Sequence, residues 1–143
     1  MTNMTLLEKR GVLIFESSKD MMSLLTGAFT KAGARVMEAD CGRDAASIID
    51  GEDPDVVCLD LTRQDSSGWS VLQSIRDSQP YMLARTIALI ANPCDRPESE
   101  LLEDCRTVSV LKPLFAVNLV AQACRALRRP AQSARTWKGA ITP

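Results

Sequence analysis

The sequence predicts an α/β fold in which helices cover both faces of a five-stranded, doubly wound parallel sheet. Strand-like and helix-like segments alternate along the chain, which is typical of βαβ units. Three of the strand-like segments are short apolar runs that end at Phe15, Leu59 and Leu111. Runs of this kind suit parallel strands that are buried on both faces. A polar residue follows each run, so we expect functional side chains at the carboxyl edge of this sheet.

The individual elements follow from this alternation and from helix-ending residues. The strands are expected over residues 11–16, 34–39, 55–60, 86–91 and 107–111. The first helix is expected to begin after a cap at Ser17 or Ser18. The later helices are expected over residues 43–50, 69–78, 98–105 and 115–128. Gly33 and Gly51 should end the first two helices, because glycine readily adopts the left-handed conformation that follows a helix. The last helix should bury one apolar stripe, made of Val117, Val120, Ala121, Cys124 and Leu127.

Strand order follows from the rule that crossover connections are right-handed. Among the few topologies left, the flavodoxin-like order 2-1-3-4-5 is the commonest for five strands. In that order the first and third strands are neighbours. Glu16 lies at the carboxyl end of the first strand and Asp60 at the carboxyl end of the third. Lys112 follows the fifth strand. We therefore expect two carboxylates and one ammonium group at a single edge, a combination suited to a divalent cation and an anion.

Length and composition indicate one small intracellular domain. The chain has 143 residues, which predicts a single domain with a real core. We expect a lead over residues 1–10, the folded domain over 11–128 and a linker or tail over 129–143. No apolar stretch reaches the roughly 18 residues of a membrane span, and the N-terminus lacks a signal-peptide pattern, so we expect a cytoplasmic protein and no membrane partner.

The inventory of reactive side chains excludes several functions. The sequence contains 5 cysteines and no histidine. A histidine-based catalytic triad and a phosphohistidine donor within this chain are therefore excluded, and a zinc site is not expected. The cysteines show no CxxC spacing, and their odd number in a chain without an export signal favours reduced thiols in the cytoplasm.

Charge is unevenly distributed along the chain. The net charge is −1, yet no acidic residue follows Asp104, whereas seven of the 17 basic residues do. A basic segment of this kind could contact nucleic acid or an acidic partner. Aromatic interleaving and DNA-reading motifs are lacking, so we interpret the charge as complementing the dipole of the last helix and do not expect a nucleic-acid partner.

Two motifs in this order and spacing carry a family resemblance. The first is Val56-Val57-Cys58-Leu59-Asp60 with Gly68 eight residues later, and the second is Leu111-Lys112-Pro113 after a short strand. Over roughly residues 11–128 the chain resembles the CheY-like receiver domain of two-component response regulators.

The resemblance implies a function for the residues at the sheet edge. Asp60 would be the phospho-acceptor, and Lys112 would pair with the incoming phosphoryl group. Glu16, Asp60 and the backbone carbonyl of Thr62 would hold Mg²⁺, a hard cation that prefers oxygen ligands. The partner would be a histidine kinase or a phosphotransfer protein, and an output domain could follow residue 143. A homodimer could form through the fifth strand and its flanking helices.

Several positions depart from the family pattern, and three of them bear on metal binding and switching. Ser17 replaces the second acidic residue after the first strand, so Mg²⁺ binding should be weak. Ala91 replaces a hydroxyl residue that normally contacts the phosphoryl group, and Ser109 replaces an aromatic switch residue. The resemblance thus implies an atypical receiver in which phosphorylation causes little switching.

Alternative functions follow from the same residues. The Asp60–Lys112 pair favours a phospho-accepting receiver, whose only catalytic activity would be its own phosphorylation. Ser17, Ala91 and Ser109 favour a pseudo-receiver that binds other proteins independently of phosphorylation. An unrelated flavodoxin-like ligand binder is less favoured, because no Gly-rich phosphate loop follows the first strand.

Overall fold

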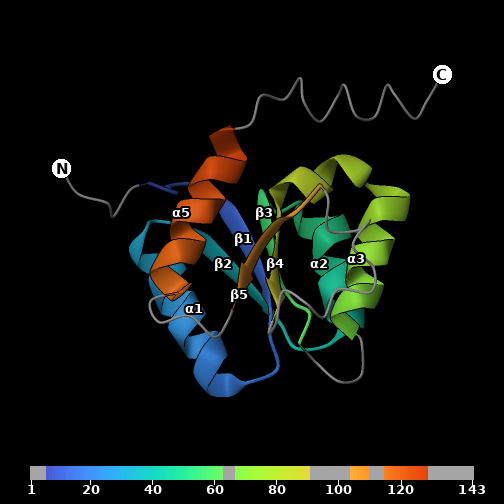
Figure 1. The fold of residues 1–143 in the computed structure, drawn as a ribbon, viewed down its shortest axis with the longest axis horizontal. Helices are drawn as coiled ribbons and strands as arrows, with labels where there is room; N and C mark the ends of the chain where they lie inside the picture. The colour runs from blue at the N-terminus through green and yellow to red at the C-terminus, as the bar shows by residue number, and fades with distance from the viewer. Residues whose placement is uncertain (1–5, 63–66, 91–103, 110–114, 129–143) are drawn as a thin grey trace.

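The computed structural model describes residues 6–62, 67–90, 104–109 and 115–128, and Figure 1 shows their arrangement. The strands are β1 (Gly11–Phe15), β2 (Arg35–Ala39), β3 (Val56–Asp60), β4 (Thr86–Ile90) and β5 (Arg106–Ser109). The helices are α1 (Lys19–Lys31), α2 (Gly42–Glu52), α3 (Ser67–Ser78), the 3₁₀ helix η2 (Pro80–Arg85) and α5 (Phe115–Arg128). Within these residues no helix is both long and apolar enough to cross a membrane.

The five strands form one parallel sheet in the order β2-β1-β3-β4-β5, as the sequence predicts. β1 and β3 are direct neighbours, with Phe15 opposite Leu59. β4 pairs with β3 on its other side, where Asp60 lies opposite Leu89. The residues at the carboxyl ends of β1 and β3 are therefore brought to adjacent positions.

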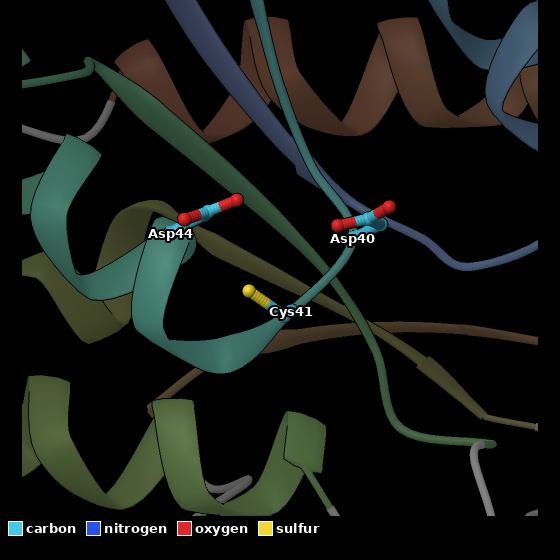
Figure 2. A group of neighbouring side chains, drawn as sticks. All are labelled: Asp40, Cys41 and Asp44. Carbon is cyan, nitrogen blue, oxygen red and sulfur yellow. The ribbon is translucent and has the colours of Figure 1, made fainter.

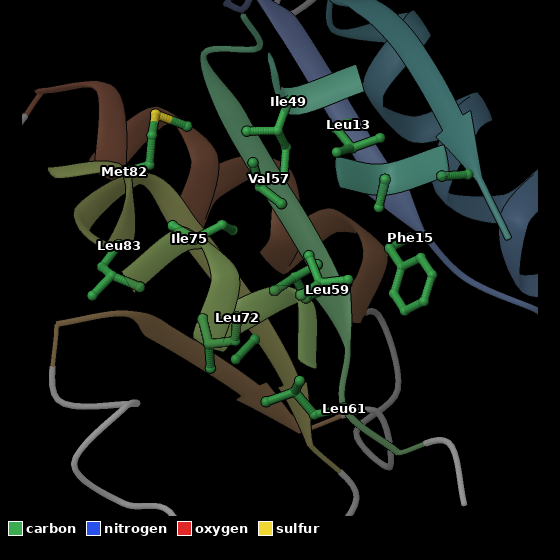
Figure 3. Close-up of a cluster of buried hydrophobic side chains, with 14 of the residues drawn as sticks. Leu13, Phe15, Ile49, Val57, Leu59, Leu61, Leu72, Ile75, Met82 and Leu83 are labelled. Atoms are coloured by element: carbon green, nitrogen blue, oxygen red, sulfur yellow. The ribbon is translucent and has the colours of Figure 1, made fainter. Parts of the chain in front are cut away.

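Helices cover both faces of the sheet, and each face has its own hydrophobic core. Helices α1 and α5 lie on one face, whereas α2 and α3 lie on the other (Figure 1). Alternate residues of β1 serve the two cores: Leu13 and Phe15 pack toward α2 and α3, and Val12 and Ile14 pack toward α1 and α5. Figure 3 shows the first core, in which Leu59 lies near Leu72. Every residue of β1, β3 and β4 is buried, which explains why these strands are continuous apolar runs.

The ends of the first two helices have different causes. Ser18 caps α1 by accepting a hydrogen bond from the Met21 amide, and Gly33 follows that helix with φ of 98°, as expected. The expectation that Gly51 ends α2 is wrong. The helix continues to Glu52, and Asp53 provides the left-handed conformation instead, with φ of 49°. Aspartate tolerates this conformation because its short side chain can hydrogen-bond locally.

Three further elements differ from the sequence-based expectation. Helix α3 begins at Ser67 rather than at residue 69, and the η2 helix was not predicted. Helix α5 has the expected bounds, but its buried line consists of Leu119, Ala123 and Ala126, while Val120, Ala121, Cys124 and Leu127 are half-buried. Its apolar stripe is wider than expected, and the centre of the stripe lies one residue earlier. The helix expected at 98–105 falls mostly outside the described residues.

Candidate functional site

Glu16 and Asp60 occupy neighbouring positions at the carboxyl edge of the sheet. Glu16 follows β1 directly and Asp60 is the last residue of β3, its neighbour in the sheet. Both side chains are buried, with only 7% of Glu16 and 3% of Asp60 exposed. Carboxyl groups are rarely buried to this extent unless they have partners. The pairing predicted from the sequence is therefore present, and both groups are shielded from solvent.

The start of α1 holds Glu16 in place. The Glu16 amide donates to the carbonyl of Ala39 at 3.1 Å, and its Oε2 accepts from the Ser18 amide at 3.1 Å. Burial raises the pKa of Glu16, and the charge of the nearby Asp60 carboxylate raises it further, while the bond from the Ser18 amide acts in the opposite direction. A buried carboxyl group next to a carboxylate favours its neutral, protonated form unless a cation lies nearby.

Asp60 is held by the residue two positions later. Its Oδ1 accepts one hydrogen bond from the Thr62 amide at 2.8 Å and a second from the Thr62 hydroxyl at 2.5 Å. The backbone beyond β3 is anchored as well, because the Leu61 amide donates to the carbonyl of Leu89 at 3.0 Å. Thr62 thus engages one carboxylate oxygen of Asp60 with both of its donors.

Gly68, the second residue of α3, packs against the backbone of Asp60. A Cβ atom added to Gly68 would lie 2.1 Å from the Asp60 carbonyl oxygen and 3.0 Å from Cδ2 of Leu61. Real Cβ atoms do not approach a backbone oxygen this closely, so only glycine fits here. The close approach of α3 to the end of β3 therefore depends on the Gly68 noted in the sequence motif.

The remaining predicted site residues are placed only in part. Ser17 is exposed beside Glu16 and provides a hydroxyl group at the position where the family pattern has a second carboxylate. Ser109 is the last residue of β5, whose backbone alone is described. Lys112 and Ala91 lie outside the described residues, so their predicted roles remain predictions.

A cleft of about 460 Å³ lies beside Glu16, between the start of α1 and the end of β2. Its lining includes Ser17, Lys19, Glu38, Asp40 and Asp44. Figure 2 shows Asp40 and Asp44 with Cys41 between them in the sequence, and one potential ligand atom from each lies within 4.8 Å of the others. Exposed acidic groups like these commonly occur without an ion. The cleft nevertheless shows that acidic side chains continue along the edge from Glu16 to the end of β2.

The donor set at Glu16 and Asp60 fits a divalent cation such as Mg²⁺. Both groups offer carboxylate oxygens, which are the ligands that this hard cation prefers. Their proximity also raises the energy of the doubly ionised pair and, after burial, contributes to the raised pKa of Glu16. A cation between the two carboxylates would remove that repulsion.

The sequence of this chain matches a family model described as the response regulator receiver domain over residues 12–114, which is more than half of its length. The chain belongs to this family. As a receiver domain it is part of two-component signalling, in which receivers interact with histidine kinases and with output domains.

Solved structures with similar folds agree with this assignment. The signal receiver domain of a protein described as a Luxo repressor from Vibrio parahaemolyticus is 23% identical, with a TM-score of 0.70, over 90% of this chain and 95% of that one. A two-component response regulator from Clostridium difficile is 22% identical, with a TM-score of 0.68, over 85% and 98% of the two chains. NtrX from Brucella abortus is 19% identical, with a TM-score of 0.70, over 93% of this chain but 29% of its own. At these identities the similarity shows the fold of the receiver domain.

Two features of the site were not found from the sequence. The hydroxyl group of Thr62 bonds Asp60, whereas only the Thr62 carbonyl was predicted to take part. Asp40 and Asp44 line the adjoining cleft, although neither was predicted as a site residue. The position of Asp40 directly after β2 was a usable signal, because the same edge rule that selects Glu16 and Asp60 selects it too.

Proposed function

We propose that Asp60 accepts a phosphoryl group from a histidine kinase or a phosphotransfer protein. The observation that supports this most strongly is the pair of buried carboxylates, Glu16 and Asp60, at the sheet edge of a receiver domain. Asp60 ends a buried strand, so its backbone is rigid. Its side chain is oriented by Thr62.

In the proposed reaction, a carboxylate oxygen of Asp60 attacks the phosphorus atom of a partner's phosphohistidine. An O–P bond forms, the N–P bond breaks, and the imidazole leaves with a proton from solvent. Bound Mg²⁺, held by Glu16, Asp60 and the carbonyl of Thr62, would offset negative charge on the phosphoryl oxygens. Lys112 would neutralise a further part of that charge.

The proposed receiver is atypical in its response. Ser17 supplies no charge to the cation site, and attraction for a cation grows with the number of carboxylates, so we infer weak Mg²⁺ binding. Ala91 offers no hydroxyl group to a phosphoryl oxygen, and Ser109 offers no aromatic ring to reorient. A ligand shifts a conformational equilibrium only through interactions that differ between the two states. Phosphorylation of Asp60 should therefore change the β5 and α5 region little.

A second candidate function is that of a pseudo-receiver, which binds other proteins independently of phosphorylation. The exposed hydroxyl of Ser17, in place of a carboxylate beside Glu16, favours this alternative. In either case we infer that the partners include an output domain, and that β5 with its flanking helices is the surface for any homodimer.

The two candidates are separated by phosphorylation with a small acyl phosphate in the presence of Mg²⁺. We expect intact-mass spectrometry to show one added phosphoryl group on the wild-type protein and none on Asp60→Asn. Asp77→Asn, which changes an exposed carboxylate on α3, is the matched control and should be modified normally. If the wild-type protein is not phosphorylated at any Mg²⁺ concentration, the result would favour the pseudo-receiver.

A further inference from the structure

The hydrogen bonds between Thr62 and Asp60 leave one carboxylate oxygen without a free lone pair. Each oxygen of a carboxylate offers about two lone-pair sites. At Asp60 Oδ1, the Thr62 amide takes one site at 2.8 Å and the Thr62 hydroxyl takes the other at 2.5 Å. A cation that uses Oδ1 must therefore displace one of these two donors.

We propose that the Thr62 hydroxyl acts as a latch on Asp60. By this we mean that its hydrogen bond to Oδ1 must break before a divalent cation can bind to that oxygen. Thr62 is in this sense a positioning residue that acts through Asp60. The inference rests on the proposed function, because it assigns a regulatory role at the same cation site.

The two donors of Thr62 differ in how easily they can leave. The amide belongs to the backbone that continues β3, and the neighbouring Leu61 amide is tied to Leu89 of β4. The hydroxyl can rotate about a single bond, and Thr62 is exposed, so a released hydroxyl group reaches water directly. The hydroxyl is therefore the donor that a cation displaces.

The latch also determines which oxygen is available for chemistry. While it is closed, Oδ1 is saturated and Oδ2 is the oxygen not engaged by Thr62. When it opens, Oδ1 can face a cation while Oδ2 remains for attack on phosphorus. The closed latch stabilises the cation-free form and so weakens Mg²⁺ binding, independently of the missing carboxylate at Ser17.

Two substitutions at the same position test the latch. Thr62→Val removes the hydroxyl group and keeps the shape of the side chain, whereas Thr62→Ser keeps the hydroxyl. Mg²⁺ affinity of the full chain would be measured by calorimetric titration. Given the net worth of a hydrogen bond to a charged acceptor and the rehydration of the released hydroxyl, Thr62→Val should lower the dissociation constant by roughly three- to tenfold. Thr62→Ser should bind Mg²⁺ as the unmodified protein does.

Several outcomes would overturn the latch. If Thr62→Val binds Mg²⁺ no more tightly than the unmodified protein, the hydroxyl does not compete with the cation. If Thr62→Ser binds as tightly as Thr62→Val, the effect comes from the methyl group or the loop rather than from the hydroxyl. A failure of all three proteins to bind Mg²⁺ would contradict the cation site of the proposed function, and the latch with it. Matching far-UV circular dichroism spectra and cooperative urea unfolding of the three proteins would verify that the fold is unchanged.

Discussion

Gly68→Ala should destabilise the domain although alanine is the better helix former. The added Cβ would lie 2.1 Å from the Asp60 carbonyl oxygen and 3.0 Å from the Asp60 carbonyl carbon. A backbone carbonyl at the end of a buried strand cannot rotate away as a flexible side chain can. The start of α3 or the end of β3 must move instead.

The magnitude follows from two opposing contributions. Forcing an extra methyl group into a packed site costs about 1–3 kcal/mol, and the contact with the backbone places this site at the upper end. Replacing glycine by alanine within a helix returns about 1 kcal/mol. The free energy of unfolding should therefore fall by about 2 kcal/mol, since the steric cost exceeds the gain in helix propensity.

Urea unfolding followed by circular dichroism measures this change, and two other helical glycines provide matched controls. A Cβ added at Gly27 of α1 or at Gly51 of α2 meets nothing within 4 Å. Gly27→Ala and Gly51→Ala should therefore stabilise the protein by about 0.5–1 kcal/mol. The folded Gly68→Ala protein should also bind Mg²⁺ more weakly, because the backbone that carries Asp60 is displaced. A Gly68→Ala protein as stable as the controls would show that α3 does not pack tightly against the backbone of Asp60.

Two further predictions concern the charge at the site and the thiol behind it. Ser17→Asp should tighten Mg²⁺ binding by about tenfold in calorimetric titration, because a third carboxylate adds Coulomb attraction at the sheet edge; an unchanged affinity would show that Ser17 is not part of the cation site. Cys58 is fully buried beneath the two carboxylates, and burial raises its pKa, with smaller contributions from the charges of Glu16 and Asp60. Above its ordinary pKa of 9.0 the thiol ionises only in the unfolded chain, so stability should fall with rising pH. The slope should be about 1.4 kcal/mol per pH unit steeper than in Cys58→Ala, and parallel pH profiles of the two proteins would contradict this.

The strands and the carboxylate pair were predictable because their signals are local. Strands buried on both faces require continuous apolar runs, and the sheet order then follows from the handedness of crossovers. Glu16 and Asp60 needed only their positions at the ends of neighbouring strands.

Other features depend on tertiary contacts that a single sequence does not report. Both glycine and aspartate can adopt the left-handed conformation, so the sequence alone does not decide whether Gly51 or Asp53 ends α2. The buried face of α5 is centred on Ala123 because small residues allow close approach to the sheet, while the sequence pattern emphasised larger neighbours. The hydrogen bond from the Thr62 hydroxyl depends on the turn after β3, which composition does not specify.

We propose that Asp60 retains its chemistry while the relay to β5 and α5 is reduced. The most direct test compares amide chemical shifts of the full chain with and without beryllofluoride and Mg²⁺, since beryllofluoride on an aspartate mimics a phosphoryl group. We predict large shifts near Asp60, Glu16 and Thr62, small shifts across residues 98–128, and no change in the sedimentation coefficient. Large shifts across residues 98–128, or a change from monomer to dimer, would show instead that an effective relay operates despite Ala91 and Ser109.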